Sequence, residues 1–155
     1  MTRAEKISFK HTLKQAGLAI IEQRIAASRS LMDDAQQAAN GEEKSSAGDK
    51  YETSRAMGHL QKDMHARQLA EQARELAALH AVNVDHLYDS VATGAIIECE
   101  KATFFVAAGL GKLTIANKTV FFLSPQAPLA QQLQHKKAGD QFVFNTLRTI
   151  IVDLY

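Results

Sequence analysis

Four acidic side chains that could take part in catalysis cluster in one short polar segment, residues 41–52. The segment reads Gly-Glu-Glu-Lys-Ser-Ser-Ala-Gly-Asp-Lys-Tyr-Glu and contains Glu42, Glu43, Asp49 and Glu52. It separates two long helical patterns, so it is expected to be the turn of an antiparallel helical hairpin. Such a turn would display the four carboxylates far from the base of the hairpin.

Asp49 and Glu52 also have an ordinary structural explanation. An Asp directly before a helix and a Glu three residues later form a relative of the capping box, and both charges suit the helix dipole. Ser46 with Asp49 offers a similar cap one step earlier. Glu42 and Glu43 have no capping role, although solvated acids are common in loops. The spacing therefore leaves a capping role and a functional role open.

Other reactive residue types do not form a recognisable catalytic set. Cys99 is the only cysteine and lies between Glu98 and Glu100, whose charges disfavour a thiolate, so it is interpreted as a packing residue. The six histidines form no compact ligand set. Gly109-Leu110-Gly111 lacks the rest of a dinucleotide-binding fingerprint. These patterns disfavour an independent enzyme.

The composition is that of a globular protein without a strong charge bias. The 155 residues are 46% hydrophobic and 23% charged, with a net charge of +1. Residues 1–85 hold 12 of the 18 basic and 12 of the 17 acidic side chains, so neither part has the excess of a general nucleic-acid binder. No run of about 18 apolar residues and no leader-like apolar core is present, so a cytoplasmic protein without a membrane span is expected.

Two helical patterns form the first part of the chain. Residues 6–40 lack proline, and Asn40-Gly41 predicts the end of the first helix. The second helix is expected over residues 50–80. Apolar residues at spacings of three and four predict a narrow, alanine-rich seam between two packed helices. The predicted seam residues are Leu13, Ile20, Ile21, Ile25, Met32, Ala35 and Ala39 in the first helix, and Met57, Leu60, Met64, Leu69, Ala73, Leu76 and Leu79 in the second.

The remainder of the chain predicts a small sheet with one helix. Strand-like runs cover residues 95–100, 103–108, 112–116, 119–123, 141–145 and 149–154, and a short helix with Pro128 in its first turn covers 127–135. Six phenylalanines are expected to form the core of this part: Phe104, Phe105, Phe121, Phe122, Phe142 and Phe144. The sequence thus predicts an α+β protein, with a helical hairpin over 1–85 and an antiparallel β domain over 86–155.

The stretch that follows the fourth predicted strand resembles the bacterial transcript cleavage factors of the Gre family. Residues 124–133 read Ser-Pro-Gln-Ala-Pro-Leu-Ala-Gln-Gln-Leu, and residues 136–140 read Lys-Lys-Ala-Gly-Asp. In the family a Ser-Pro leads into a short helix and then a Gly-Lys-Lys-x-Gly-Asp turn. Here His135 stands where the family has the first glycine of that turn. The predicted layout, a hairpin with an acidic turn before a small β domain, is also similar.

The hairpin turn offers two alignments with the Gre pattern. Gly48-Asp49-Lys50-Tyr51-Glu52 matches the family's Asp-x-x-Glu spacing, but Thr53-Ser54-Arg55 follows where the family has Asn-Ala-Glu-Tyr. If Tyr51 is matched to the family's tyrosine, the acidic pair shifts toward Glu43 and the aspartate is lost. Asp49 and Glu52 are therefore the first candidate pair, and Glu42 and Glu43 are the second.

The resemblance implies a fold, a partner and a role. The β domain would be FKBP-like and would dock on RNA polymerase through Ser124, Pro125, Pro128 and Leu129. The hairpin would enter the secondary channel, where its tip acids would help to hold a Mg²⁺ ion of the polymerase during transcript cleavage. The chain would have no cofactor of its own and would be a monomeric accessory factor, not an enzyme.

The resemblance also implies a basic patch near the RNA. Arg55, His59 and Lys62 follow one another at spacings of four and three on one helix face, although a solvated face is the commoner reason for such a pattern. A different function stays open for the whole chain: a coiled-coil interaction module with the same fold and no role at the polymerase active site. An exposed apolar strip on the hairpin would favour that alternative. Prolyl isomerase activity rests on fold analogy alone.

Overall fold

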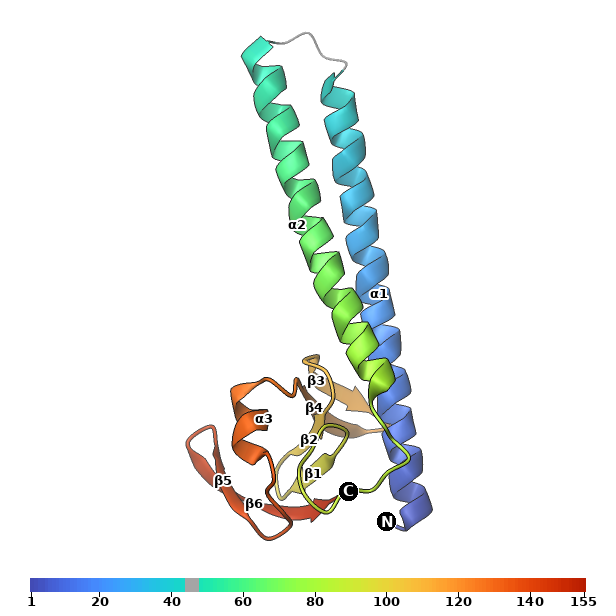
Figure 1. Cartoon of the computed structure of the whole chain (residues 1–155), viewed down its shortest axis with the longest axis vertical. Helices are drawn as coiled ribbons and strands as arrows, with labels where there is room; N and C mark the ends of the chain where they lie inside the picture. Colours follow the sequence, from blue (N-terminus) through green and yellow to red (C-terminus); the bar gives the residue numbers. More distant parts are fainter. Residues whose placement is uncertain (44–47) are drawn as a thin grey trace. The chain divides into compact units, whose positions relative to one another are not determined.

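Two long helices and a six-stranded sheet make up the protein, which a computed structural model describes over residues 1–43 and 48–155. Helix α1 (Arg3–Glu43) and helix α2 (Gly48–Ala81) precede the sheet and one short helix, α3 (Pro128–Leu133), as Figure 1 shows. This element order confirms the α+β class. No helix in these described ranges is both long and apolar enough to cross a membrane.

Two units can be distinguished by their internal contacts. The first unit combines Met1–Ala19 with Ala77–Tyr155, and the second is Ile20–Leu76. The domain boundaries predicted from sequence, 1–85 and 86–155, stay a prediction. Each unit is described by itself below.

The first helix extends beyond its expected end. The prediction that Asn40-Gly41 stops the helix is wrong, because α1 continues through Gly41 to Glu43. An exposed glycine costs a helix only about 1 kcal/mol relative to alanine, so neighbouring helical turns can carry it. Helix α1 also begins at Arg3, without a separate initial turn. The Thr2 side chain caps it, since the Glu5 backbone N–H donates to Thr2 Oγ1 over 3.2 Å.

The sheet has the strand order β3-β4-β2-β1-β6-β5. All neighbouring strands are antiparallel except β2 and β4, which run parallel, so the predicted antiparallel sheet contains one parallel pair. The strands lie within one or two residues of their expected positions: β1 (Ile96–Cys99), β2 (Thr103–Val106), β3 (Gly111–Ile115), β4 (Lys118–Leu123), β5 (Gln141–Phe144) and β6 (Leu147–Leu154).

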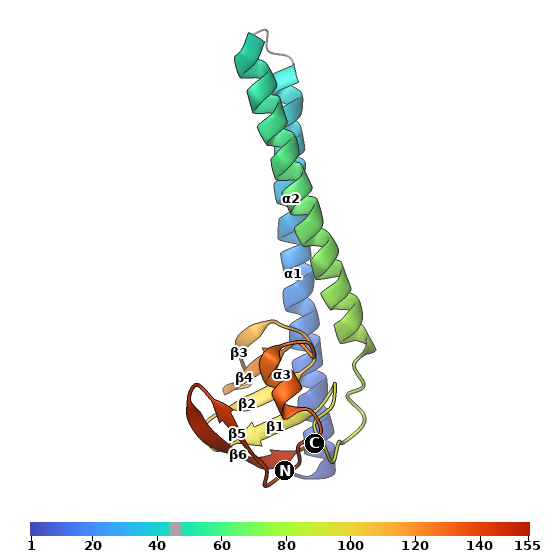
Figure 2. The same cartoon turned by 60° about the vertical axis from the view of Figure 1, so that its left-hand side comes forward.

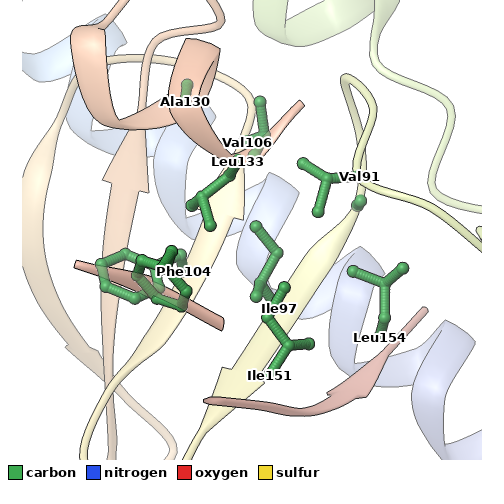
Figure 3. Packing of buried hydrophobic residues seen from close by; sticks show 10 residues of the cluster. Val91, Ile97, Phe104, Val106, Ala130, Leu133, Ile151 and Leu154 are labelled. Carbon is green, nitrogen blue, oxygen red and sulfur yellow. The ribbon is translucent and has the colours of Figure 1, made fainter. Parts of the chain in front are cut away.

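Both faces of the central strand β2 are buried. Phe104 faces the core cluster that α3 covers with Ala130 and Leu133, and Figure 3 shows these side chains together. On the other face Phe105 packs edge-on against Phe122, with ring centroids 5.3 Å apart. The phenylalanine core is confirmed, since four of the six rings are buried. The other two, Phe121 of β4 and Phe144 of β5, are partly buried.

Helix α1 reaches the Phe122 face of the sheet through a glycine. A Cβ atom placed on Gly17 would lie 2.9 Å from Leu79 Cδ2, 3.0 Å from Phe122 Cε2 and 3.3 Å from Leu110 Cδ1. These distances are shorter than ordinary van der Waals contact, so no side chain fits at this position. The close approach lets α1 cover the sheet directly, with Leu13 fully buried one turn earlier.

Two hairpins of the sheet close through two-residue turns with positive φ at both positions. Ala116 and Asn117 have φ angles of 51° and 62°, and Asn145 and Thr146 have 49° and 66°. This is the type I′ geometry, whose twist matches that of the flanking strands. In the first of these hairpins Lys118 follows the turn directly and begins β4.

Two polar side chains of α1, Lys14 and His11, hold the end of α2 and the segment that follows it. Lys14 Nζ donates to the backbone carbonyls of His80 at 2.8 Å and Val82 at 2.9 Å. His11 Nε2 lies 2.6 Å from Asp85 Oδ1. These contacts hold a stretch without regular secondary structure against one face of α1.

A third side chain of α1, Lys10, holds the same segment from the interior of the protein. Its side chain is fully buried, with Nζ 2.6 Å from the carbonyl oxygen of His86 and 4.6 Å from the ring centroid of Tyr88. A carbonyl and an aromatic face both attract an ammonium group, yet they replace only part of its hydration. Burial accordingly lowers the pKa of Lys10 to about 8.

Replacing Gly17 with alanine should destabilise the protein by about 1–3 kcal/mol, because the new methyl group overlaps Leu79 and Phe122. The gain in helix propensity, about 1 kcal/mol, does not offset this overlap. Urea unfolding followed by circular dichroism measures the difference. Gly41→Ala is the matched control, since no atom lies within 4 Å of its added Cβ. A Gly17→Ala variant as stable as the Gly41→Ala variant would contradict the close packing.

Because Lys10 is buried, the free energy of unfolding should increase with pH in mild alkali. The unfolded chain holds this proton up to the ordinary pKa of 10.5, whereas the folded chain releases it near pH 8. Between these values the unfolded state binds more protons, so the free energy of unfolding rises with pH, by up to about 3 kcal/mol. Lys10→Met should remove this rise and Lys14→Met should retain it in urea titrations at pH 7.5, 9 and 10.5. Equal pH dependence in the wild type and Lys10→Met would refute the assignment.

Candidate functional site

The second unit is a two-helix hairpin with a regular seven-residue repeat. Within residues 20–76 the helices run side by side in both views (Figures 1 and 2). Buried and partly buried positions recur at spacings of four and three, which is the coiled-coil pattern. They are Ile21, Ile25, Ser28, Met32, Ala35 and Ala39 on α1, and Gly58, Lys62, His65, Leu69, Gln72 and Leu76 on α2.

Contacts across this seam show why it uses small and polar residues. Ser28 Oγ donates to Gln72 Oε1 over 2.9 Å, so two polar side chains satisfy each other between the helices. A Cβ atom on Gly58 would lie only 3.1 Å from the Cβ of Ala39. The helices therefore approach closely in the half of the hairpin nearest the turn, where a large side chain would not fit.

The predicted seam is right on α1 from Ile21 to Ala39. On α2 it is wrong over the first turns and at Ala73, which is exposed, whereas Gln72 lies at the seam. Met57, Leu60 and Met64 are 61%, 65% and 62% exposed, so they do not lie between the helices. At about 100° per residue, they point away from the face of α2 that carries Gly58 and Leu69. The large apolar residues of α2 therefore change from one helix face to another between Met64 and Leu69.

The four candidate acids lie on either side of the hairpin turn. Glu42 and Glu43 are the last two residues of α1, and Asp49 is the second residue of α2. The expectation that Asp49 precedes the helix as its cap is wrong, because α2 begins at Gly48. The alternative cap at Ser46 lies outside the described residues, as do the side chains of the first three acids. Glu52 is exposed and follows Asp49 by three residues in α2.

The three basic candidates follow Glu52 along α2 at the expected helical spacing. Arg55 and His59 are exposed, and Lys62 is partly buried at a seam position. Their proximity to RNA stays a prediction.

The remaining reactive residues do not form a second site. Cys99 is partly buried, and burial raises the pKa of its thiol to about 11, which makes the thiolate rare at neutral pH. Burial and a 2.8 Å hydrogen bond from its hydroxyl to Glu98 Oε1 raise the pKa of Tyr155. Over residues 1–43 and 48–155, no group of three or more His, Cys, Asp or Glu side chains is placed to hold a metal ion.

The segment proposed for docking forms a defined corner between β4 and α3. Ser124 Oγ accepts a hydrogen bond from the Gln126 backbone N–H at 3.2 Å and donates to Gln126 Oε1 at 2.7 Å. Pro128 is the first residue of α3 and is exposed, while Pro125 and Leu129 are partly buried. The corner therefore presents Pro128 to solvent from a rigid backbone, and its docking role stays a prediction.

The turn after α3 explains the glycine of the Gre pattern. His135 has φ of +68°, the left-handed conformation that favours glycine. Its N–H donates to the carbonyl of Val91 at 3.0 Å, and the Val91 N–H donates to the carbonyl of Lys136 at 2.8 Å. Lys137 N–H donates to Asp140 Oδ2 at 2.8 Å and closes the turn. The backbone thus has the conformation that the family's glycine would suit, although the side chain differs.

Sequence reasoning missed one exposed surface because its residues looked like core. Met57, Leu60 and Met64, with Ala56 beside them, form an apolar strip on the outer face of α2, which we call the outer strip. Thr53 and Glu52 join Ala56, Met57 and Leu60 around a shallow hollow at its turn-proximal end. Only the small size of Ala35, Ala39 and Gly58 could have indicated that the large residues point outward.

Comparison with known proteins gives a distant structural likeness. No protein-family model and no curated protein matches the sequence. One solved structure, described as the transcription factor Gfh1, is similar with a TM-score of 0.34 and 13% sequence identity, over 90% of this chain and 94% of that chain. A TM-score this low does not identify a common fold.

Replacing His135 with glycine should stabilise the protein by about 1 kcal/mol, because a non-glycine residue pays for the left-handed conformation. His135→Ala keeps that penalty and removes only the ring, so it separates backbone strain from side-chain contacts. Thermal unfolding should give a higher midpoint for His135→Gly than for His135→Ala. The reverse order would show that the turn does not depend on backbone conformation.

Proposed function

We propose that this chain is a Gre-like regulator that binds bacterial RNA polymerase and inserts its hairpin into the secondary channel. The observation that carries the proposal is the hairpin itself, which ends in a turn with acidic residues on both sides. Helix α2 has 34 residues, which corresponds to roughly 50 Å of helix. The sequence resemblance over residues 124–140 supports the same partner, and the left-handed backbone at His135 fits the glycine of that pattern.

The chemistry would belong to the polymerase, with the tip supplying ligands. Asp49 and Glu52 lie three residues apart in the first turns of α2, and Glu42 and Glu43 end α1. Carboxylate oxygens are the hard ligands that Mg²⁺ prefers, and the ion usually takes only one or two of them from protein. The pair would help to hold a Mg²⁺ ion of the polymerase and to orient the water that attacks the transcript.

Docking and orientation would come from the first unit. Ser124, Pro125, Pro128 and Leu129 form the corner before and within α3, and the hydrogen bonds of Ser124 fix its backbone. Arg55, His59 and Lys62 lie beyond Glu52 on α2 and would meet the RNA 3′ segment. We expect the accessory factor to act as a monomer and to need no resident cofactor.

Backtracked bacterial elongation complexes with Mg²⁺ test the function. The wild-type chain should shorten the transcript, whereas Asp49→Ala/Glu52→Ala should lower the cleavage rate at least about a hundredfold, because two Mg²⁺ ligands are lost. Asp63→Ala/Glu71→Ala is the matched control, since it removes two exposed acids of α2 away from the turn and should leave the rate unchanged. A second double variant, Glu42→Ala/Glu43→Ala, distinguishes the two acidic pairs.

The other outcomes of this assay separate the remaining possibilities. Binding to polymerase without cleavage would indicate a channel-occupying regulator whose tip does no chemistry. Absence of both cleavage and polymerase binding would exclude the proposal.

One observation favours the alternative function, a coiled-coil interaction module. The outer strip leaves Met57, Leu60 and Met64 more than half exposed on a helix that has already buried its opposite face. Apolar side chains gathered at helical spacing on an exposed face are typical of an interaction surface. The strip lies one to four turns from the candidate acids, so an interaction there would involve the same end of the hairpin.

A further inference from the structure

The outer strip is complementary to itself when two α2 helices meet in opposite directions. Leu60 lies at its centre, with Met57 three residues before it and Met64 four residues after it. In an antiparallel pair centred on Leu60, the two Leu60 side chains meet, and each Met57 faces the Met64 of the other copy. Methionine adapts its shape to an irregular apolar partner, which suits this position.

The charged residues beside the outer strip, Glu52 and Arg67, are also placed to pair across the same two-fold axis. Glu52 lies eight residues before Leu60 and Arg67 seven residues after it, both exposed and both on the same edge of the strip. In the antiparallel pair each Glu52 would therefore lie beside the Arg67 of the other copy, giving two ion pairs of opposite charge. A parallel pair would instead place the two copies of Glu52, and the two copies of Arg67, on opposite sides of the interface, so this ion pairing would be lost.

We propose that the outer strip is a self-association surface, through which two copies of this chain form an antiparallel dimer centred on Leu60. The contact from Glu52 to Arg67 spans fifteen residues, or roughly 22 Å of helix. This length buries less surface than the standard 1,200–2,000 Å² interface, so the dimer is weak and depends on concentration. The proposal does not depend on the polymerase function, and it differs from the monomer that the sequence resemblance implies.

Dimerisation would have a consequence for the hairpin turn. The paired region begins at Glu52, so each copy would cover the start of the other's α2, where the candidate acids lie. A high concentration of the chain would therefore withhold its own tips from a partner that must receive one hairpin at a time.

Sedimentation equilibrium of the full chain over a range from about 5 µM to 1 mM tests the association. Leu60→Glu should lower the association constant at least about a hundredfold, because it places two carboxylates against each other at the centre. Val152→Glu is the matched control: Val152 is 64% exposed on β6, as Leu60 is on α2, and its replacement should leave the dimer intact. Circular dichroism confirms that each variant keeps its helices.

Charge reversal tests the direction of the pair. Glu52→Lys and Arg67→Glu should each weaken the dimer about tenfold or more, because each replaces two attractions with two repulsions. The double variant Glu52→Lys/Arg67→Glu should restore wild-type association. A chain that stays monomeric at all concentrations, a dimer that survives Leu60→Glu, or a double variant that fails to recover would each overturn the proposal.

Discussion

Burial of strand β2 on both faces is the constraint on which the first unit depends. All four of its residues are buried, so each face of the sheet needs a cover. Helix α3 supplies one cover with Ala130 and Leu133, and the part of α1 up to Ala19 supplies the other. Because Gly17 lets α1 approach the phenylalanine rings directly, the beginning of the chain is a structural part of the sheet unit and not only the first arm of a hairpin.

Lysine side chains complete this cover by capping backbone carbonyls that have no partner in a helix or strand. Lys14 donates to the backbone carbonyls of His80 and Val82. Lys10, which is fully buried, donates to the carbonyl of His86. An amine on a long flexible stem can reach carbonyls that no strand would pair, which allows the chain to cross from α2 to β1 without regular secondary structure. The ammonium group of Lys10 therefore lies where water is excluded, and this burial lowers its pKa.

The strands and the core of the sheet could be predicted because local pattern and burial agree there. β-branched and aromatic residues between glycine turns mark strands whether or not the order of strands is known, but the parallel pairing of β2 and β4 is a non-local property that no local pattern contains. The seam of α2 failed for a different reason. Hydrophobicity selected Met57, Leu60 and Met64, whereas the helices meet through Gly58, Lys62 and His65, because Ala35 and Ala39 leave no space for large side chains. The candidate acids were located by composition, and the role proposed for them involves a partner.

The composition of the seam changes along the hairpin, and this sets a gradient of local stability. From Leu69 to Leu76 the two helices share apolar side chains and the Ser28–Gln72 hydrogen bond, whereas from Gly58 to His65 the contacts are small or polar. Local opening therefore requires less free energy in the second stretch, and its backbone amides should exchange with solvent sooner than those of the first. A hairpin built in this way can adjust its outer turns to the shape of a receiving surface while its inner turns stay paired.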